Sequence, residues 1–184
     1  MNSENTLKRK VKLFDEFGIL MVMIALFVFL SIASPYFFKW ENISNMLLQS
    51  VFVMLVAFGM MFVLTIGGID LSVGAVLGYS GAVAGMVIAG GGSVMLGVLA
   101  GLGTGALLGV INGFFITKLT IAPFLVTFAM SSIVRGILML STTNGAVTGF
   151  AVEDFMWLAQ GTVAGLPVPV FITIIVFVIL LILF

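Results

Sequence analysis

The sequence predicts an all-α fold, a polytopic bundle of about six transmembrane helices in this chain. Of its 184 residues, 62% are hydrophobic and only 8% are charged. Soluble domains contain about 45–50% apolar and about 25% charged residues, because they must cover their surface with polar groups. The apolar runs show no strict alternation and are longer than the strands of a membrane barrel, which need about 9–11 residues. The chain is therefore expected to cross a lipid bilayer several times as helices.

The composition also excludes several classes of function. Seven Lys and Arg residues balance seven Asp and Glu residues, so the net charge indicates no nucleic-acid partner. The chain has no Cys and no His, which removes thiolate chemistry and the commonest general base and metal ligand. No Gly-x-x-x-x-Gly-Lys-[Ser/Thr] motif is present for binding ATP. We therefore expect no catalytic residues, no metal and no cofactor in this chain, and no enzyme activity of its own.

The first expected helix is the apolar run at 17–33, which Pro35 ends. The tail at 1–16 is expected to be cytoplasmic and carries a basic cluster, Lys8, Arg9, Lys10 and Lys12. A cleaved signal peptide is the alternative, since Ser31 and Ala33 resemble a cleavage site behind a basic segment. The run is longer than the apolar region of a signal peptide, about 7–15 residues, and further spans follow. We expect a retained membrane span, followed by interfacial residues in "YFFKW" at 36–40.

Five further apolar runs follow in order, and together they complete a single transmembrane domain at 17–184. The runs lie at 43–66, 73–89, 94–116, 124–140 and 168–184. Gly67 and Gly68 allow a sharp turn before the third run, and Gly90 to Gly92 close it. A polar stretch at 141–167 separates the last two runs.

The basic residues predict the orientation of these spans, because Lys and Arg concentrate in cytoplasmic loops. With the tail inside, six crossings place 67–72 and Lys118 in the cytoplasm and leave 34–42, 90–93 and 141–167 outside. This assignment has an alternative. If "GGIDLS" at 67–72 is a re-entrant break in a helix, the orientation reverses after residue 66.

The fourth run carries a glycine at every fourth position. These glycines are Gly97, Gly101, Gly105, Gly109 and Gly113. On a helix they form a ridge without side chains, which lets the backbone of a neighbouring helix approach closely in lipid. The sequence therefore predicts tight helix packing there. The "GLGTGA" segment at 101–106 also fits a loose dinucleotide pattern, but no strand precedes it, so we reject that reading.

Three polar residues lie within or next to the apolar runs. Asp70 is expected to cap a helix that begins near Leu71, by accepting hydrogen bonds from its first amides. Asn112 is expected to donate a hydrogen bond between helices. Arg135 has two open readings, a residue lining a water-filled path and a side chain that reaches the outer interface.

The motifs, in this order, resemble one family of membrane proteins. "GGIDLSVGAVLG" (67–78), "GVINGFFITKLTIAPFLVTFAMSSIVRGI" (109–137), "TTNG" (142–145) and "GLPVPVFI" (165–172) carry the resemblance. The chain is similar to the permease subunits of bacterial ATP-binding-cassette importers for simple sugars, such as the ribose, xylose and galactoside permeases. The resemblance implies a multi-pass protein of the bacterial cytoplasmic membrane that forms a translocation pathway for a sugar.

The resemblance also implies partners and functional positions. The partners are a cytoplasmic ATP-binding cassette subunit, an extracytoplasmic solute-binding protein and a second permease copy, in a homodimer or heterodimer within the lipid bilayer. The residues at motif positions that we expect to shape the pathway are Asp70, Ser72, Asn112, Thr127 and Arg135, with Pro123 beside them.

The chain departs from the family in one respect. Family permeases are longer and carry an ATPase-coupling loop with Gly-Arg and Ala-Ala…Ser-Gly features that are absent here. We therefore expect an N-terminal part of such a permease, or the product of a truncated gene. Alternative functions are a permease for autoinducer-2 or another small polar solute, an ion-coupled secondary transporter and a structural membrane protein built on the glycine ridge.

Overall fold

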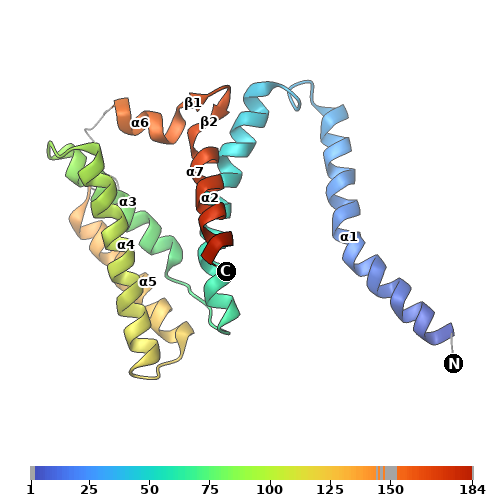
Figure 1. The fold of residues 1–184 in the computed structure, drawn as a ribbon, viewed down its shortest axis with the longest axis horizontal. Helices are drawn as coiled ribbons and strands as arrows, with labels where there is room; N and C mark the ends of the chain where they lie inside the picture. Colours follow the sequence, from blue (N-terminus) through green and yellow to red (C-terminus); the bar gives the residue numbers. More distant parts are fainter. Residues whose placement is uncertain (1–2, 144, 146, 148–152, 184) are drawn as a thin grey trace. The chain divides into compact units, whose positions relative to one another are not determined.

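A computed structural model of the chain describes residues 3–143, 145, 147 and 153–183. Within this part the chain forms seven helices and one pair of short antiparallel strands, in the order shown in Figure 1. The elements are α1 (Ser3–Ala33), α2 (Trp40–Thr65), α3 (Val73–Ala89), α4 (Val94–Thr117), α5 (Pro123–Ser141), α6 (Glu153–Gln160), β1 (Thr162–Val163), β2 (Leu166–Pro167) and α7 (Val168–Leu183). The prediction of a mostly helical fold is confirmed.

The helices begin and end close to the predicted apolar runs. The helix expected at 73–89 has those bounds in the structure, and α4 extends the run at 94–116 by one residue. The first helix differs most, because it begins at Ser3 and so includes most of the polar tail. The sequence did not predict α6 or the strand pair, both of which lie in the polar stretch at 141–167. The expectation of a purely α fold is corrected by this strand pair.

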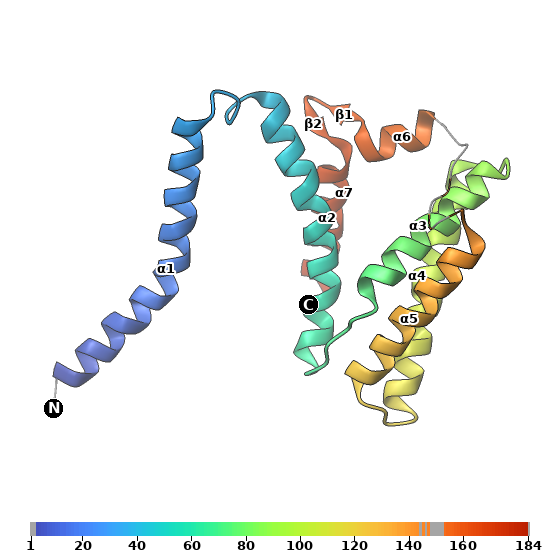
Figure 2. The same ribbon diagram turned by 180° about the vertical axis from the view of Figure 1, so that it is seen from behind.

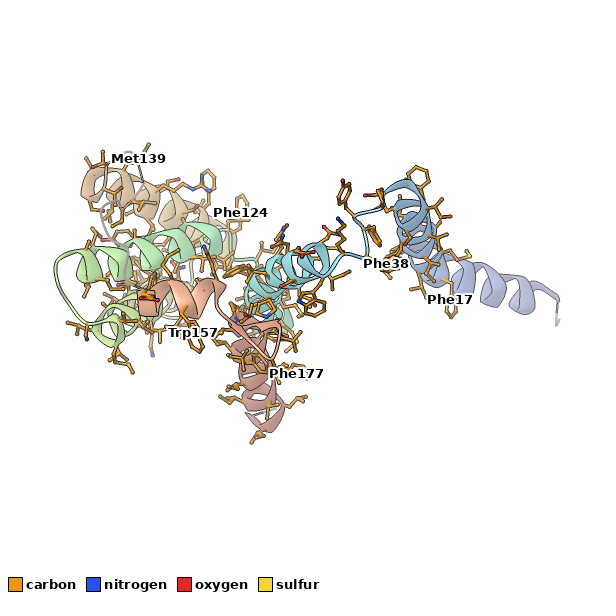
Figure 3. The ribbon with its side chains drawn as sticks, turned by 90° about the horizontal axis from the view of Figure 1, so that it is seen from above. Phe17, Phe38, Phe124, Met139, Trp157 and Phe177 are labelled. Atoms are coloured by element: carbon orange, nitrogen blue, oxygen red, sulfur yellow. The ribbon has the colours of Figure 1, made fainter. Side chains whose placement is uncertain are left out.

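Three helices, α2, α4 and α5, are long and apolar enough to cross a membrane. Three shorter apolar helices accompany them, at 17–33, 73–89 and 168–182. The structure therefore describes a multi-pass membrane protein. Many large apolar side chains are exposed, such as Ile19, Val110 and Leu140, and Figure 3 shows such side chains projecting outward from the helices. In a bilayer, the acyl chains of lipids cover such apolar surfaces, so these side chains do not face water.

The chain divides into two compact units, Met1–Leu47 and Leu48–Phe184. In the first unit α1 ends at Ala33, and the turn that follows is closed by aromatic packing and one side-chain hydrogen bond. The ring of Phe37 meets that of Phe27 edge-on at 5.0 Å, and the amide of Asn42 donates to the carbonyl of Phe37 at 2.8 Å. The ammonium group of Lys39 lies 4.3 Å from the ring centre of Tyr36, a cation–π contact in the expected interfacial segment.

In the second unit α3, α4 and α5 form an up-and-down bundle (Figure 1 and Figure 2). Its core is made by Ala75 of α3 with Met130 and Val134 of α5, and Val134 is fully buried. Tyr79, Leu108 and Ile111 pack against these three residues. Side chains from all three helices therefore share one apolar core, which fixes the positions of the polar groups described below.

The turn between α3 and α4 is tight because glycines close the first helix and a serine opens the second. Gly91 has φ +88°, and the amides of Gly91 and Gly92 bond to the carbonyls of Ile88 and Val87. This is the Schellman ending of a helix, which needs a left-handed residue. Ser93 then accepts a hydrogen bond from the amide of Leu96 at 3.2 Å and caps α4.

Candidate functional site

The segment between α2 and α3 has irregular backbone, and glycines shape its start. Gly67 has φ +75°, which L-residues with a side chain rarely adopt. Its amide bonds to the carbonyl of Leu64, and the amide of Gly68 bonds to the carbonyl of Val63. These two bonds end α2 in a Schellman motif. The expected sharp turn at Gly67 and Gly68 is thus present, and it directs the chain into 69–72.

Asp70 organises the end of this segment. One carboxylate oxygen, Oδ1, accepts a hydrogen bond from the amide of Ser72 at 2.7 Å and a second from the hydroxyl of Ser72 at 2.6 Å. Asp70 itself is half-buried, whereas Ser72 is only 1% exposed. Hydrogen bonds to an ionised carboxylate are about twice as strong as neutral ones, so this pair fixes the approach to α3.

The expected capping role of Asp70 needs a correction. The helix begins at Val73 and not near Leu71, and the amide that Asp70 accepts belongs to Ser72, the residue just before the helix. Ser72 already has helical φ and ψ, and its carbonyl accepts from the amide of Val76. Asp70 therefore forms an Asx turn ahead of the helix, two residues N-terminal to the amide it binds.

Asn112 of α4 joins this turn from the neighbouring helix. Its side-chain amide Nδ2 donates to the hydroxyl oxygen of Ser72 at 2.9 Å, which confirms the expected hydrogen bond between helices. Asn112 is 5% exposed, and its carbonyl oxygen Oδ1 accepts no hydrogen bond from the residues that the structure describes. Asn112 thus donates to Ser72, and Ser72 donates to Asp70. Within the described residues, the buried Oδ1 of Asn112 is left without a donor.

Thr127 of α5 joins the same segment from the other side. Its hydroxyl oxygen accepts from the amide of Leu71 at 3.1 Å. The hydroxyl lies 2.9 Å from the carbonyl oxygen of Pro123 in its own helix and 3.2 Å from that of Ile69. One buried threonine therefore satisfies backbone groups of the irregular segment that would otherwise be left unpaired.

These four residues, Asp70, Ser72, Asn112 and Thr127, are called the polar cluster below. The structure brings together four of the five residues expected to line a pathway, from three separate stretches of the chain. Asn112 lies five residues before the end of α4, about 7.5 Å along its axis, and Thr127 lies four residues into α5, about 6 Å. The cluster therefore lies inside the bundle, more than one helical turn from the α4–α5 connection.

The fifth residue, Arg135, lies outside the polar cluster. It is exposed on α5, two turns beyond Thr127, and its guanidinium forms no salt bridge within the described part of the chain. Ser131, one turn before it, is buried.

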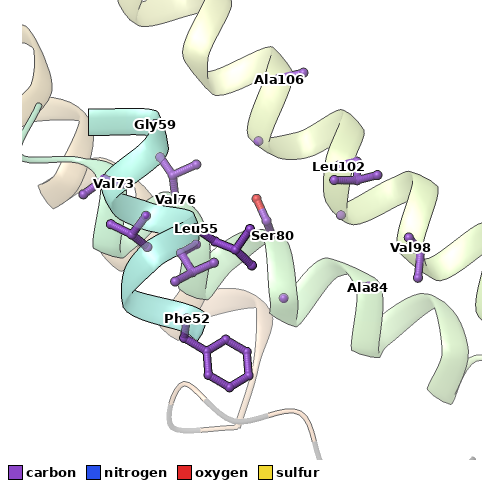
Figure 4. Close-up of a pocket in the computed structure, with 15 residues that line it drawn as sticks. Phe52, Leu55, Gly59, Val73, Val76, Ser80, Ala84, Val98, Leu102 and Ala106 are labelled. Atoms are coloured by element: carbon purple, nitrogen blue, oxygen red, sulfur yellow. The ribbon is translucent and has the colours of Figure 1, made fainter. Parts of the chain in front are cut away.

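A separate apolar pocket of about 740 Å³ lies between α2, α3 and α4 (Figure 4). Phe52 and Leu55 of α2 line one wall, and Leu102 and Ala106 of α4 line another. Ser80 of α3 points its hydroxyl into this pocket, and that buried oxygen has no hydrogen-bond partner in the described chain. Sequence reasoning missed Ser80, since a single serine in a helical run carries no signal of its own.

The glycines of α4 differ in what they face. A Cβ atom at Gly101 would lie 2.9 Å from the carbonyl oxygen of Ser80, and one at Gly97 would lie 2.6 Å from the side chain of Ile88. At Gly105 the nearest atom is the Ser80 hydroxyl at 3.3 Å. A Cβ at Gly109 or Gly113 would meet nothing within 4 Å. Only the N-terminal half of the predicted ridge is in close contact with α3.

Two of the remaining sequence expectations concern residues that the structure describes only in part. Asn144 of the "TTNG" motif lies outside the described residues. The side chains of the basic cluster at 8–12 also lie outside them. No group of three or more acidic, His or Cys side chains that suits a metal ion is present among the described residues.

Comparison with known proteins adds independent information. The model of the family described as branched-chain amino acid transport system / permease component matches residues 42–184. The chain is 36% identical over 168 residues to the L-arabinose ABC transporter permease protein of Azospirillum brasilense, covering 91% of this chain and 49% of that one. It is 40% identical over 168 residues to the ribose import permease protein of Bacillus subtilis, covering 90% and 52%. It is 35% identical over 168 residues to the D-allose transport system permease protein of Escherichia coli K12, covering 91% and 51%.

The chain spans about half the length of these curated relatives. No solved structure matches it. The similarity covers all of the polar cluster, because Asp70 and Thr127 both lie within the matched range 42–184.

Proposed function

The chain belongs to the family described as branched-chain amino acid transport system / permease component, and we propose on that basis that it forms part of the translocation pathway of an ATP-driven importer for a simple sugar. The observation that carries the proposal is the identity of 35–40% to permeases named for L-arabinose, ribose and D-allose, over about nine-tenths of this chain. The resemblance read from the motifs is thus confirmed at the level of the family. The solute and the partners follow by inference from those relatives.

The polar cluster is the part of the chain that we assign to the pathway. Irregular backbone is tolerated at membrane depth only where protein or a water-filled cavity surrounds it. In the segment at 69–72, protein groups supply hydrogen-bond partners, because Thr127 accepts from the amide of Leu71 and Ser72 donates to Asp70. The half-buried carboxylate of Asp70 and the unpaired Oδ1 of Asn112 are both hydrogen-bond acceptors. Acceptors of this kind suit the hydroxyl groups of a sugar or the water that accompanies it.

The cluster also ties three helices together, which suits a part of a transporter that moves as one body. Ser72 links the start of α3 to α4, and Thr127 links the preceding segment to α5. The glycines Gly97 and Gly101 hold α3 and α4 at close approach. The positions Gly109 and Gly113 face open space within the described chain. Arg135 is assigned to the wall of the pathway.

The partners proposed for the whole protein are those of the importer class. ATP hydrolysis belongs to a separate cytoplasmic ATP-binding cassette subunit, and the solute arrives on a solute-binding protein outside the membrane. A second permease copy, identical or related, completes the pathway. The protein lies in the bacterial cytoplasmic membrane with its N-terminus in the cytoplasm, the orientation that the basic cluster favours.

Uptake in cells that carry or lack this gene tests the proposal. Labelled ribose, L-arabinose and D-allose are supplied singly, and a branched-chain amino acid is added because the family description names that class. We expect one sugar to lose its high-affinity uptake in the deletion strain and to regain it on complementation. If the deletion strain loses leucine uptake and keeps the uptake of all three sugars, the solute is an amino acid and the proposed sugar is wrong.

The energy source separates this function from an ion-coupled transporter. Uptake by an ATP-driven importer stops when ATP is depleted and persists when an ionophore dissipates the ion gradients. The opposite pattern would exclude the proposal.

A further inference from the structure

The short helix α6 is fixed at the start of α7 by a chain of hydrogen bonds. The amide of Gly161 donates to the carbonyl of Trp157 at 2.7 Å, and the carbonyl of Gly161 accepts from the amide of Val168 at 2.8 Å. Val168 is the first residue of α7. The strands β1 and β2 pair antiparallel between the two helices, with Thr162 opposite Pro167. The end of α6 therefore lies level with the first turn of α7.

The start of α7 marks a boundary between polar and apolar sequence. The helix Val168–Leu183 contains no charged residue, and Thr173, its one polar residue, returns its hydroxyl to the carbonyl of Pro169 at 2.9 Å. The stretch before it, at 141–167, carries the charged residues Glu153 and Asp154 and the polar residues Gln160 and Thr162. A helix of this kind belongs in hydrocarbon, so its first turn lies at the edge of the hydrocarbon layer. The hydrogen bonds through Gly161 place α6 at that same edge.

The two faces of α6 differ in exposure. Phe155, Leu158 and Ala159 are half-buried, and they recur at the three- and four-residue spacing of a single helix face. The opposite face is exposed and mixes polar and apolar side chains: Glu153, Met156, Trp157 and Gln160. Trp157 is 51% exposed and Met156 is 42% exposed. Figure 3 labels Trp157 on this helix. A large aromatic ring thus faces outward at the level where the apolar helix begins.

The described residues around Trp157 contact its ring but not its polar end. The indole Nε1–H donates no hydrogen bond to the residues that the structure describes. Gly161 makes room for the ring, because a Cβ atom at Gly161 would lie 2.7 Å from Cδ1 of Trp157. A tryptophan with an apolar ring and a free N–H suits a boundary where one side is hydrocarbon and the other is hydrated.

We propose that the outer face of α6 is a lipid-binding face, on which Trp157 and Met156 insert at the boundary between headgroups and acyl chains. The indole N–H then donates to a lipid ester or phosphate oxygen, and Glu153 and Gln160 remain in the headgroup layer. The face anchors the start of α7 at a defined depth. This inference depends on the membrane-spanning character of the chain and is independent of the solute.

Tryptophan fluorescence in vesicles tests the proposal, since Trp40 and Trp157 are the two tryptophans of this sequence. The protein that carries this chain is reconstituted into phosphatidylcholine vesicles as Trp40→Phe and as Trp40→Phe/Trp157→Phe, and the difference in emission reports Trp157. Bromine atoms are placed near the head or near the end of the acyl chain. We expect bromines near the head to quench the Trp157 emission more strongly, and aqueous iodide to quench it weakly.

A matched control gives the depth scale. Ile175→Trp in the Trp40→Phe/Trp157→Phe background places an exposed tryptophan in the middle of α7, where bromines near the chain end are expected to quench most. Trp157 emission that ignores both brominated lipids and responds fully to iodide would overturn the proposal. If iodide quenches the Trp157 emission and a purified solute-binding protein abolishes that quenching, the face docks a protein. This result would also overturn the proposal of a lipid-binding face.

Discussion

The side-chain amide of Asn112 donates a 2.9 Å hydrogen bond to the hydroxyl of Ser72, which joins the C-terminal part of α4 to the residue just before α3 across 40 positions of sequence. The same hydroxyl donates to Asp70 at 2.6 Å. Ser72 therefore uses its hydroxyl both as acceptor and as donor, and removal of the hydroxyl leaves the amide of Asn112 without its acceptor and takes one of two hydrogen bonds from Asp70. The polar cluster depends on this one side chain more than on any other.

Replacement Ser72→Ala is expected to destabilise the protein by about 1–3 kcal/mol, because a buried amide and one bond to a carboxylate lose their partner. Thermal unfolding in detergent measures the change. The matched control is Ser132→Ala on the exposed side of α5, where the hydroxyl bonds only to the carbonyl of Phe128 in its own helix. We expect the control to stay within about 0.5 kcal/mol of the parent. Equal stabilities for the two variants would contradict the assigned role of Ser72.

Replacement Thr127→Val is expected to free the segment that precedes α3. Valine keeps the shape of threonine but cannot accept the hydrogen bond from the amide of Leu71. Hydrogen exchange at Leu71 should therefore become faster, while exchange in the middle of α4 stays unchanged. Thr127→Ser retains the hydroxyl and should restore slow exchange. If valine and serine give the same rate at Leu71, the hydroxyl does not hold this segment.

The two halves of the glycine ridge are expected to respond oppositely to alanine. Gly101→Ala places a methyl group 2.9 Å from the carbonyl oxygen of Ser80 and should separate α3 from α4, at a cost of about 1–3 kcal/mol. Gly109→Ala meets nothing within 4 Å in this chain and should gain up to about 1 kcal/mol of helix propensity. Thermal unfolding of the two variants in detergent compares them. A loss of stability in Gly109→Ala as large as in Gly101→Ala would mean that the whole ridge is packed.

The glycine ridge shows how far the sequence predicts the packing and where it stops. At about 100° per residue, Gly109 lies about 80° around the helix from Gly101, whereas Asn112 lies only about 20° from it. The line of α4 that faces α3 therefore runs from Gly101 to Asn112 and leaves the row of glycines. The four-residue spacing predicted the row of glycines on α4. The direction in which α3 crosses α4 decides which of these glycines α3 covers.

The bounds of the helices were predictable for a simpler reason. Glycine after a helix and proline in its first turn set helix ends and starts through local backbone geometry. Gly91 follows the end of α3, and Pro123 is the first residue of α5. The contacts of the segment at 69–72 with α4 and α5 were not predictable, since Asn112 reaches Ser72 and Thr127 reaches Leu71 through tertiary packing over 40 and more residues. The helix α6 was missed because its half-buried face is short and lies in a polar stretch.

Replacement Gly67→Ala is expected to cost about 1–2 kcal/mol, because alanine in the left-handed region places Cβ too close to the backbone. Gly67 has φ +75°, and its amide closes the end of α2. Gly74→Ala is the control, since Gly74 lies within α3, has no positive φ and has open space around it. The control should be neutral or slightly stabilising. Chemical unfolding of both variants measures the difference, and an equal response would show that the turn tolerates a right-handed residue.

Replacement of Arg135 separates its two readings. Its side chain is exposed and forms no salt bridge in the described part of the chain, so Arg135→Ala should change the free energy of unfolding by less than about 0.5 kcal/mol. If Arg135 lines the pathway, as proposed, solute uptake should fall in Arg135→Ala. Arg135→Lys should not restore it, because lysine lacks the planar set of donors of a guanidinium. If Arg135 only anchors the helix at the interface, lysine reaches the headgroups equally well and uptake recovers. Uptake measured in both variants, at matched amounts of protein in the membrane, therefore decides between a pathway residue and an anchor.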